Sequence, residues 1–232
     1  MITKDKKSAK IETVYYDGKS YSSFVLNHLH KLGNTDFLIF NFDILPLIDF
    51  EKELCHQTKI LSELAKLSKH LSCYVIAAGD IKTDEKEERA ALVFEQGKLL
   101  TVIQFISSKT KSGGACVNFF DTAFGRVAIF LLDNAAQVEF YQLAHVYGVN
   151  IVFALPQKQE YKKHMNICAV YANERLGLNI VCFSGKQVKS FCSEKKNKSG
   201  QALIRSVHYL KNSARISSFS KHIHKSIYSR LE

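Results

Sequence analysis

Short apolar runs alternate with amphipathic stretches along most of the chain. Residues 50–71 place leucine and isoleucine mostly three and four positions apart, which predicts one long helix. The runs DFLIFNF (36–42), YVIAA (74–78) and NIVFA (150–154) are short and almost continuously apolar, as in buried strands. Strands therefore alternate with helices, an order typical of a layered α/β domain.

The middle of the chain breaks this alternation. The segments 90–94 and 99–106 flank the turn EQGK, which predicts a β-hairpin with Gly97 in its turn. A hairpin here argues against a simple doubly wound sheet and favours two mixed sheets packed face to face, with helices outside. The same patterns predict helices at 21–32, 135–147 and 161–176, strands at 11–16, 115–120, 126–131 and 179–183, strand candidates at 202–207 and around Ser217, and a charged loop at 82–89.

Composition narrows the class of protein. The chain has 232 residues, of which 46% are hydrophobic, so a sizeable core is expected. No apolar run is long enough for a transmembrane helix, and the polar start MITKDKKSAK lacks the apolar region of a secretory signal, so a cytoplasmic location is expected. The six cysteines form no C-x-x-C pair and lie mostly in apolar surroundings, which favours reduced, buried thiols. We expect no metal and no cofactor.

Positive charge is concentrated at the end of the chain. From Phe183 onward there are eleven basic side chains and two acidic ones, so this segment carries +9 of the net charge of +10. Such basicity suits nucleic acid, an anionic surface or an acidic protein. Aromatic residues are sparse there and no RNA-binding motif is present. A solvated surface with a tail is therefore the favoured interpretation, and nucleic-acid binding is the less favoured one.

Six segments, in order, resemble the nitrilase or carbon–nitrogen hydrolase superfamily over roughly residues 11–204. In that family a strand ending in Pro-Glu is followed by a glycine-ended strand, a hairpin, a G-x-x-I-C-Y-D strand, a GA-x-hydrophobic strand and a helix containing A-x-E-N. Asp133 aligns with the aspartate of the cysteine strand. The counterparts here are DFLIFNFDI, CYVIAAGD, ALVFEQGKLLTVIQ, FGRVAIFLLD, AHVYGVNIVFALP and AVYANERLGLNIVCFSG.

The resemblance implies a fold, an assembly and a domain layout. It implies a nitrilase-like four-layer α-β-β-α sandwich with two mixed sheets, and a homodimer made by apposing the helices outside one sheet. Residues 1–204 would form this domain. Residues 205–232 would be a basic C-terminal tail, which either belongs to the same domain or extends the dimer interface.

The family's chemistry needs a cysteine nucleophile, a carboxylate base and a lysine that stabilises the oxyanion. By resemblance the base falls at Asp43 or one residue to either side, the lysine at Gln104 and the cysteine at Leu131. Gln104 carries no positive charge, and Leu131 cannot be a nucleophile. These departures predict that thioester catalysis is lost, so no catalytic residue is expected and the chain is not expected to be an enzyme.

Three functions remain open. The favoured one is a ligand-binding, regulatory or scaffold module, in which Asp43, Gln104 and Asp133 contact a small-molecule ligand. The second is an active amide hydrolase with an atypical nucleophile, for which Cys116, in the stretch GGACVNFF, is the candidate; a buried thiol at a strand start is the favoured interpretation of that residue. The third is a binder of nucleic acid or an anionic surface through the basic C-terminal region.

Overall fold

The computed structural model describes residues 8–14, 35–40, 45–83, 86–105, 118–156, 161–184, 187–191, 203–210 and 216–218. The expected helix at 21–32, Asp43 and Cys116 lie outside these ranges. The chain divides into two compact units, which we describe separately. One unit comprises residues 10–105 and 208–218, and the other comprises residues 1–9, 106–207 and 219–232.

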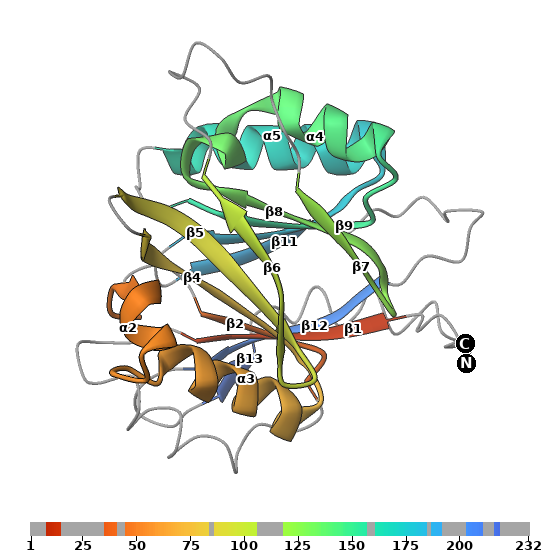
Figure 1. Ribbon diagram of the computed structural model, residues 1–232. Helices are drawn as coiled ribbons and strands as arrows, with labels where there is room; N and C mark the ends of the chain where they lie inside the picture. Colours follow the sequence, from red (N-terminus) through yellow and green to blue (C-terminus); the bar gives the residue numbers. More distant parts are fainter. Residues whose placement is uncertain are drawn as a thin grey trace. The chain divides into compact units, whose positions relative to one another are not determined.

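The first unit contains most of an eight-stranded mixed sheet, with the strand order β13-β12-β1-β2-β4-β5-β6 and β3 paired to β4. Parallel pairs join β1 to β2, β2 to β4 and β3 to β4. Antiparallel pairs then join β4 to β5 and β5 to β6. Helices α2 and α3 lie on one face (Figure 1). The bounds are β1 Ser8–Val14, β2 Phe37–Phe40, β3 Ile48–Asp49, α2 Phe50–Leu54, α3 Ile60–Leu71, β4 Tyr74–Thr83, β5 Lys86–Glu95, β6 Lys98–Gln104, β12 Leu203–Leu210 and β13 Ile216–Ser218.

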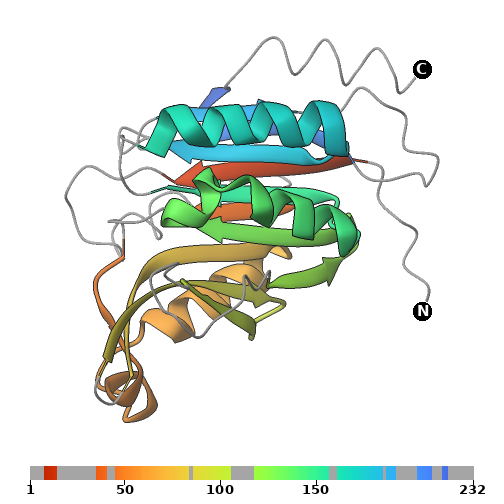
Figure 2. The ribbon, with the colours of Figure 1, turned by 90° about the horizontal axis from the view of Figure 1, so that it is seen from above.

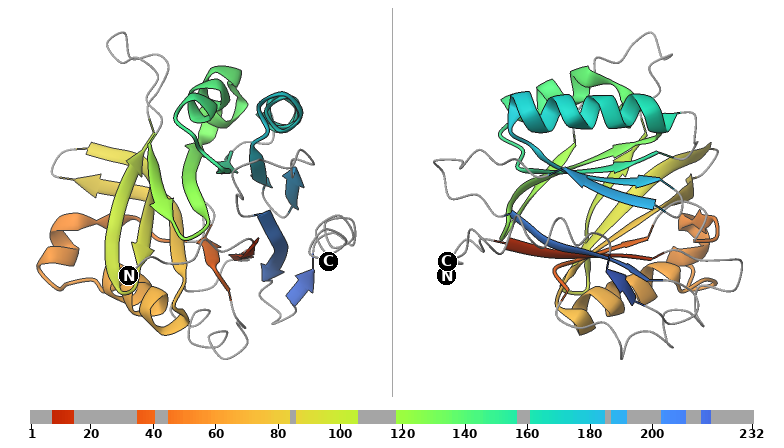
Figure 3. Two further views of the ribbon diagram at one scale, coloured as in Figure 1. Left: turned by 90° about the vertical axis from the view of Figure 1, so that its right-hand side faces the viewer. Right: turned by 180° about the vertical axis from the view of Figure 1, so that it is seen from behind.

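The second unit contains a five-stranded mixed sheet in the order β11-β10-β9-β8-β7. Its three central strands are parallel, and β7 and β11 pair antiparallel at the two edges. Helices α4 and α5 lie side by side on one face of this sheet (Figures 2 and 3). The bounds are β7 Phe119–Thr122, β8 Gly125–Leu131, the 3-10 turn η2 Leu132–Ala136, α4 Val138–Val146, β9 Ile151–Leu155, α5 Tyr161–Leu176, β10 Asn179–Ser184 and β11 Gln187–Phe191.

Each sheet has a core between its strands and its helices. In the eight-stranded sheet, Leu38, Ala77 and Leu92 pack with Leu64 and Leu67 of α3. In the five-stranded sheet, the strand residues Ala128, Phe130, Val152, Ala154 and Ile180 pack with α4 and α5, through Tyr141, Met165, Ala169 and others. The alternate strand residues are buried too, among them Ile39, Ile76, Ile129 and Phe153. Burial on both faces explains why these strands read as continuous apolar runs.

The prediction of one long helix at 50–71 is wrong, because two helices occupy this span. Helix α2 ends at Leu54, and His56 then adopts the left-handed conformation, with φ of 58°. The Glu53 carboxylate accepts hydrogen bonds from the backbone N–H groups of Ile60 and Leu61, at 2.9 and 3.0 Å. This carboxylate therefore satisfies the free donors at the start of α3 and stabilises the break.

The charged loop predicted at 82–89 is also mostly strand. Strands β4 and β5 stay paired as far as Thr83 and Lys86. Opposite charges face each other across this extension, with Asp80 opposite Arg89 and Lys82 opposite Glu87. The Arg89 guanidinium lies 3.2 Å from the Asp80 carboxylate. Cross-strand charge pairs of this kind favour strand pairing although each residue alone is typical of a loop.

The hairpin between β5 and β6 is confirmed, since Gln96 and Gly97 both have positive φ, as a two-residue I′ turn requires. The α5 helix follows its predicted bounds. Strand β7 covers Phe119–Thr122, and residues 115–117 of the predicted strand lie outside the described ranges. Helix α4 begins at Val138 because a 3-10 turn precedes it. Strand β11 was not predicted. Its sequence QVKSF alternates apolar with polar residues, but it is too short to be distinguished from a loop.

Candidate functional site

The strand-to-helix corner after β8 is the candidate site. Leu131 ends the strand in an extended conformation, pairs with Leu155 of β9 and is 1% exposed. It lies on the same face as Ile129, opposite the face on which Phe130 packs with α4. The position that resembles the family's cysteine is therefore filled by a fully buried leucine.

The next residue carries unusual backbone strain. Leu132 has φ of 51°, in the left-handed region, where a leucine side chain costs about 1 kcal/mol or more. Strain of this kind gathers at functional corners and persists only where the surrounding structure enforces it. The sequence predicts the corner, but nothing in the letters LL predicts which leucine turns left-handed.

Two polar side chains follow the strained residue. Asp133 is half-buried and Asn134 is buried, and the Oδ1 atom of each is buried with no hydrogen-bond partner among the residues that the structure describes. Buried polar atoms in proteins almost always have a partner, which is protein, water or ligand. The corner therefore offers two unsatisfied acceptors on consecutive residues. Asp133, a residue predicted from sequence, is one of them, whereas Asn134 was not predicted.

The far side of the corner is fixed to the helices. The Tyr141 hydroxyl donates to the carbonyl of Ala135 at 2.8 Å, and the Cys168 thiol donates to the carbonyl of Ala136 at 3.3 Å. These bonds connect the 3-10 turn to α4 and α5, which gives the unsatisfied acceptors a rigid support.

Two thiols in the core of the five-stranded sheet, Cys168 and Cys182, are protonated at neutral pH. Burial raises the pKa of the Cys182 thiol to about 12, and it also raises the pKa of Cys168. In the eight-stranded unit, burial with help from the Glu12 and Asp36 carboxylates raises the pKa of Cys73 to about 12. Because the thiolate is the reactive form, these three buried cysteines are poor nucleophiles. Cys55, after α2, is exposed.

The other predicted positions lie elsewhere. Gln104 ends β6 in the eight-stranded sheet, where it is exposed and lies opposite Ala90 of β5. Residues opposite each other in a ladder share a face, so Gln104 points to the face on which α3 packs. The structure brings Leu131 and Asp133 together at one corner, and Gln104 lies on the other sheet. Among the residues that the structure describes, no cluster of histidine, cysteine or acidic side chains suits a metal ion.

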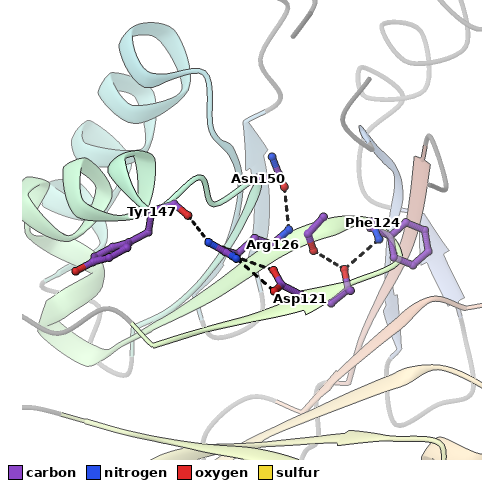
Figure 4. A network of polar contacts seen from close by, with 7 residues as sticks. Asp121, Phe124, Arg126, Tyr147 and Asn150 are labelled. Atoms are coloured by element: carbon purple, nitrogen blue, oxygen red, sulfur yellow. Dashed lines mark hydrogen bonds and ion pairs between the residues drawn. The ribbon is translucent and has the colours of Figure 1, made fainter. Parts of the chain in front are cut away.

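The opposite end of β8 holds a hydrogen-bond network that sequence reasoning missed (Figure 4). The Arg126 side chain donates to both oxygens of Asp121, at 2.8 and 3.3 Å, and to the carbonyl of Tyr147 at 2.8 Å. Its backbone N–H donates to Oδ1 of Asn150 at 2.8 Å. This network ties the β7–β8 hairpin to the start of β9. Gly125, which begins β8 directly after the turn, was the sequence feature that could have pointed to this end of the strand.

Solved structures with the same arrangement of elements are nitrilase-superfamily proteins. A mutant of a nitrilase-superfamily amidase from Nesterenkonia AN1 matches with a TM-score of 0.56 and 10% identity, over 77% of this chain and 76% of that one. The chain has the nitrilase fold. A carbon–nitrogen hydrolase from Helicobacter pylori G27 matches this nitrilase-like chain with a TM-score of 0.55 and 14% identity, over 75% and 72% of the two chains.

A further match shows the chemistry of one such amidase. It is a mutant of the Nesterenkonia enzyme with the acetamide moiety of fluoroacetamide added covalently at the active site cysteine, with a TM-score of 0.55 and 9% identity, over 78% and 76% of the two chains. No family model matches the sequence of this chain, and no curated protein does either. The predicted fold class is thus confirmed by structure, at identities that show the fold alone.

Proposed function

We propose that this nitrilase-like chain does not carry out thioester hydrolysis and acts instead as a ligand-binding, regulatory or scaffold module. The buried leucine at 131 is the observation that carries the proposal. A thioester requires a thiol at the position where the carbonyl carbon of the substrate is attacked, and a leucine side chain offers no nucleophile and no proton to transfer. Gln104 supports the same conclusion because it has no positive charge for an oxyanion.

The proposed ligand contacts at this corner are Asp133 and Asn134. Their unsatisfied oxygens accept hydrogen bonds and carry negative charge or a negative dipole end, so they suit a ligand with N–H donors. Asp43 and Gln104 remain proposed contacts on the strength of the resemblance. A ligand held here should raise the melting temperature of the protein, and Asp133→Ala with Asn134→Ala should abolish that rise.

Fluoroacetamide labelling tests the loss of chemistry directly. The purified chain and a nitrilase-superfamily amidase are incubated with the reagent, and intact mass is then measured. We expect no acetamide adduct on this chain at concentrations that modify the amidase fully. The Cys55→Ser variant controls for slow alkylation of the exposed thiol. Stoichiometric labelling of that variant, together with ammonia release from simple amides, would overturn the proposal.

An amide hydrolase with an atypical nucleophile is the competing function. The three buried cysteines with raised pKa values do not favour it, and Cys116 stays its candidate nucleophile on the strength of the sequence. Amidase turnover that disappears in Cys116→Ala, and persists in Cys55→Ser, would establish this function.

Binding of nucleic acid or an anionic surface is the third function, supported only by the charge after residue 183. Truncation at that point is a poor test, because it removes β11, which pairs with β10, and also β12 and β13. Replacing Lys195, Lys196 and Lys198 by glutamine removes charge and leaves the residues of β11, β12 and β13 unchanged. Affinity for DNA that falls steeply with added salt and is lost in this variant would support the function.

We also propose that the module is cytoplasmic, as the sequence predicts, and that it forms a homodimer, as the resemblance implies. Within the described ranges, no helix is long and apolar enough to cross a membrane. Residues 1–204 and the basic segment 205–232 are proposed as one domain with its extension, since β12 spans this boundary and lies in the eight-stranded sheet.

A further inference from the structure

Strand β6 ends the eight-stranded sheet beside β5, and no further strand pairs with it within the described ranges (Figure 1). Proteins usually keep such edge strands short or place charged side chains on them. As far as the structure describes them, β13 has three residues, β7 has four including Asp121, and β11 has five including Lys189. Strand β6 has seven residues, and its only charged residue is Lys98 at the start. The β6 edge is therefore the longest and least charged of these four edges.

Two leucines add exposed apolar surface to the β6 edge. Leu99 is 40% exposed and Leu100 is 43% exposed. The pairing with β5 shifts here, because Phe94 lies opposite Leu99 and the next pair is Val93 with Thr101, so Leu100 is the extra residue of a β-bulge. The bulge interrupts only the start of the edge, and the ladder is regular from Thr101 onward.

The pairing of β5 with β6 shows which backbone groups face away from the sheet. The Phe105 N–H donates to the carbonyl of Arg89 at 2.8 Å, one step beyond the pair of Ala90 and Gln104. In an antiparallel ladder, hydrogen-bonded pairs alternate with pairs that are not bonded to each other. The backbone N–H and C=O of Gln104 and of Val102 therefore point outward from the edge. Within the described part of the chain, no backbone group bonds to them.

A pair of lysines marks the beginning of this edge. Lys98 starts β6, and Lys69 of α3 lies beside the turn, since a Cβ on Gly97 would lie 3.3 Å from the Cβ of Lys69. Both lysines are exposed, and neither has an ion-pair partner among the residues that the structure describes, although Glu95 lies opposite Lys98. A strand antiparallel to β6 would end near these lysines, so charge complementarity favours one that ends in a carboxylate.

We propose that the β6 edge binds an extended segment of another protein, which adds as an antiparallel strand and carries a carboxylate at its carboxyl-terminal end. The outward backbone groups of Val102 and Gln104 form its hydrogen bonds, the two exposed leucines contact its apolar side chains, and the two lysines bind its carboxylate. This surface belongs to a different sheet from Asp133, and the proposal stands whether or not the corner at Asp133 binds a ligand.

Selection from a random library of displayed heptapeptides with free carboxyl termini tests the edge, with the full-length chain as bait. Proline at position 102 removes an outward N–H and leaves the β5–β6 hydrogen bonds in place, because proline is tolerated where an edge N–H faces solvent. We expect selected peptides to alternate apolar with polar residues. By fluorescence anisotropy, Val102→Pro should bind them roughly tenfold more weakly than the wild type. Gln104→Pro removes the other outward N–H at an exposed side chain and is the second variant.

Removal of the lysines tests the orientation of the added strand. Lys69→Gln with Lys98→Gln should weaken binding of a selected peptide by roughly three- to tenfold at low salt. Lys59→Gln with Lys86→Gln is the matched control, because it removes the same charge from exposed positions away from the start of β6. Amidation of the peptide carboxyl terminus should reproduce the loss if the lysines bind that group. Replacement of a terminal acidic residue by glutamine should reproduce it if they bind a side chain.

The outcomes that would refute the proposal differ for each of its parts. A library without enrichment, or selected peptides that bind equally well to both proline variants and the wild type, would refute strand addition at β6. Binding that is lost in the proline variants but unchanged in the lysine variant would refute the carboxylate and the orientation. Self-association of the full-length chain that Val102→Pro abolishes in sedimentation would assign the edge to a second copy and refute a different protein as its partner. Far-UV circular dichroism and melting temperatures check that each variant is folded.

Discussion

The two ends of strand β8 differ although the strand is only seven residues long. At the amino end, Arg126 forms four hydrogen bonds to Asp121, Tyr147 and Asn150, and the side chains complement each other. At the carboxyl end, Leu132 is left-handed, and the buried Oδ1 atoms of Asp133 and Asn134 have no hydrogen-bond partner within the described ranges. One end is built for stability, and the other retains strain and unsatisfied polarity. That contrast places the candidate site at the carboxyl end, where ligands bind in open α/β sheets.

Glycine substitutions at Leu131 and Leu132 give the strongest test of this difference between the two ends. Leu131→Gly should cost about 4–5 kcal/mol, because it removes a fully buried side chain from an extended strand. Leu132→Gly should change the free energy of unfolding by less than about 1 kcal/mol. Glycine relieves the left-handed strain, which offsets the lost contacts of a half-buried side chain.

Urea unfolding followed by fluorescence or circular dichroism measures both free energies of unfolding. Equal losses at the two positions would show that Leu132 is not strained in solution, and the carboxyl end would lose its main distinction.

Substitution of Gly125 tests the opposite end of the strand. Gly125 has φ of 100°, and a Cβ there would lie 2.2 Å from Oδ1 of Asn150. Gly125→Ala should therefore destabilise the protein by about 3 kcal/mol. Gly148→Ala is the matched control, with φ of 70° and nothing within 4 Å of the added carbon, and should cost only about 1 kcal/mol. A difference of less than half a kcal/mol between the two variants would argue against a tight Asn150 contact.

Removal of the Asn150 side chain has a smaller expected effect. Asn150→Ala leaves the backbone N–H of Arg126 without its acceptor, which should cost about 2 kcal/mol. Asn134→Ala at the other end of the strand should cost less than about 1 kcal/mol, because Oδ1 of Asn134 has no hydrogen bond to lose. Chemical denaturation of the two variants measures this asymmetry. A larger loss at Asn134 than at Asn150 would reverse our assignment of the two ends.

The smallest effect concerns the titration of Asp121. The hydrogen bond from Arg126 holds the pKa of the Asp121 carboxyl below its ordinary value. A lowered folded-state pKa gives stability that is present above the unfolded pKa and is lost as the pH falls through the folded pKa. Because the Asp121 side chain is 72% exposed, the contribution should be about 0.5 kcal/mol or less.

Carbon-detected NMR titration of the carboxyl group measures the Asp121 pKa in the wild type and in Arg126→Met. We expect the pKa to rise towards its ordinary value in the variant. An unchanged pKa would remove the ion pair from the network.

Sequence patterns predicted most of the elements because they are local. A buried parallel strand reads as a run of apolar residues, and α5 repeats its buried positions with helical spacing, so both are visible in a short window. The order of these elements, with a hairpin in the middle, indicated an α/β domain with two mixed sheets, and the resemblance then implied the nitrilase-like fold. The predictions for 50–71 and 82–89 were wrong because a capping contact or a cross-strand contact decides the secondary structure of these segments. Glu53 satisfies the start of α3, and the Asp80–Arg89 pair extends a hairpin.

The sequence predicted which residues stand at the candidate site, but it did not predict their backbone conformation or their hydrogen bonds. The order of motifs placed a leucine where the family has cysteine, and it placed Asp133 beside it. Asn134 and the Arg126 network were missed because satisfied and unsatisfied hydrogen bonds depend on residues far apart in the chain, such as Asn150, 24 positions from Arg126.

The sequence by itself determined the type and order of the elements and the absence of a thiol at position 131, because side-chain chemistry and periodicity are written in the chain. Only the tertiary structure decided that Leu131 is extended and buried while Leu132 turns left-handed, and that Oδ1 of Asp133 and Oδ1 of Asn134 find no hydrogen-bond partner in the described part of the chain. The physical reason is that burial and hydrogen bonding are properties of packed neighbours, which no single segment specifies.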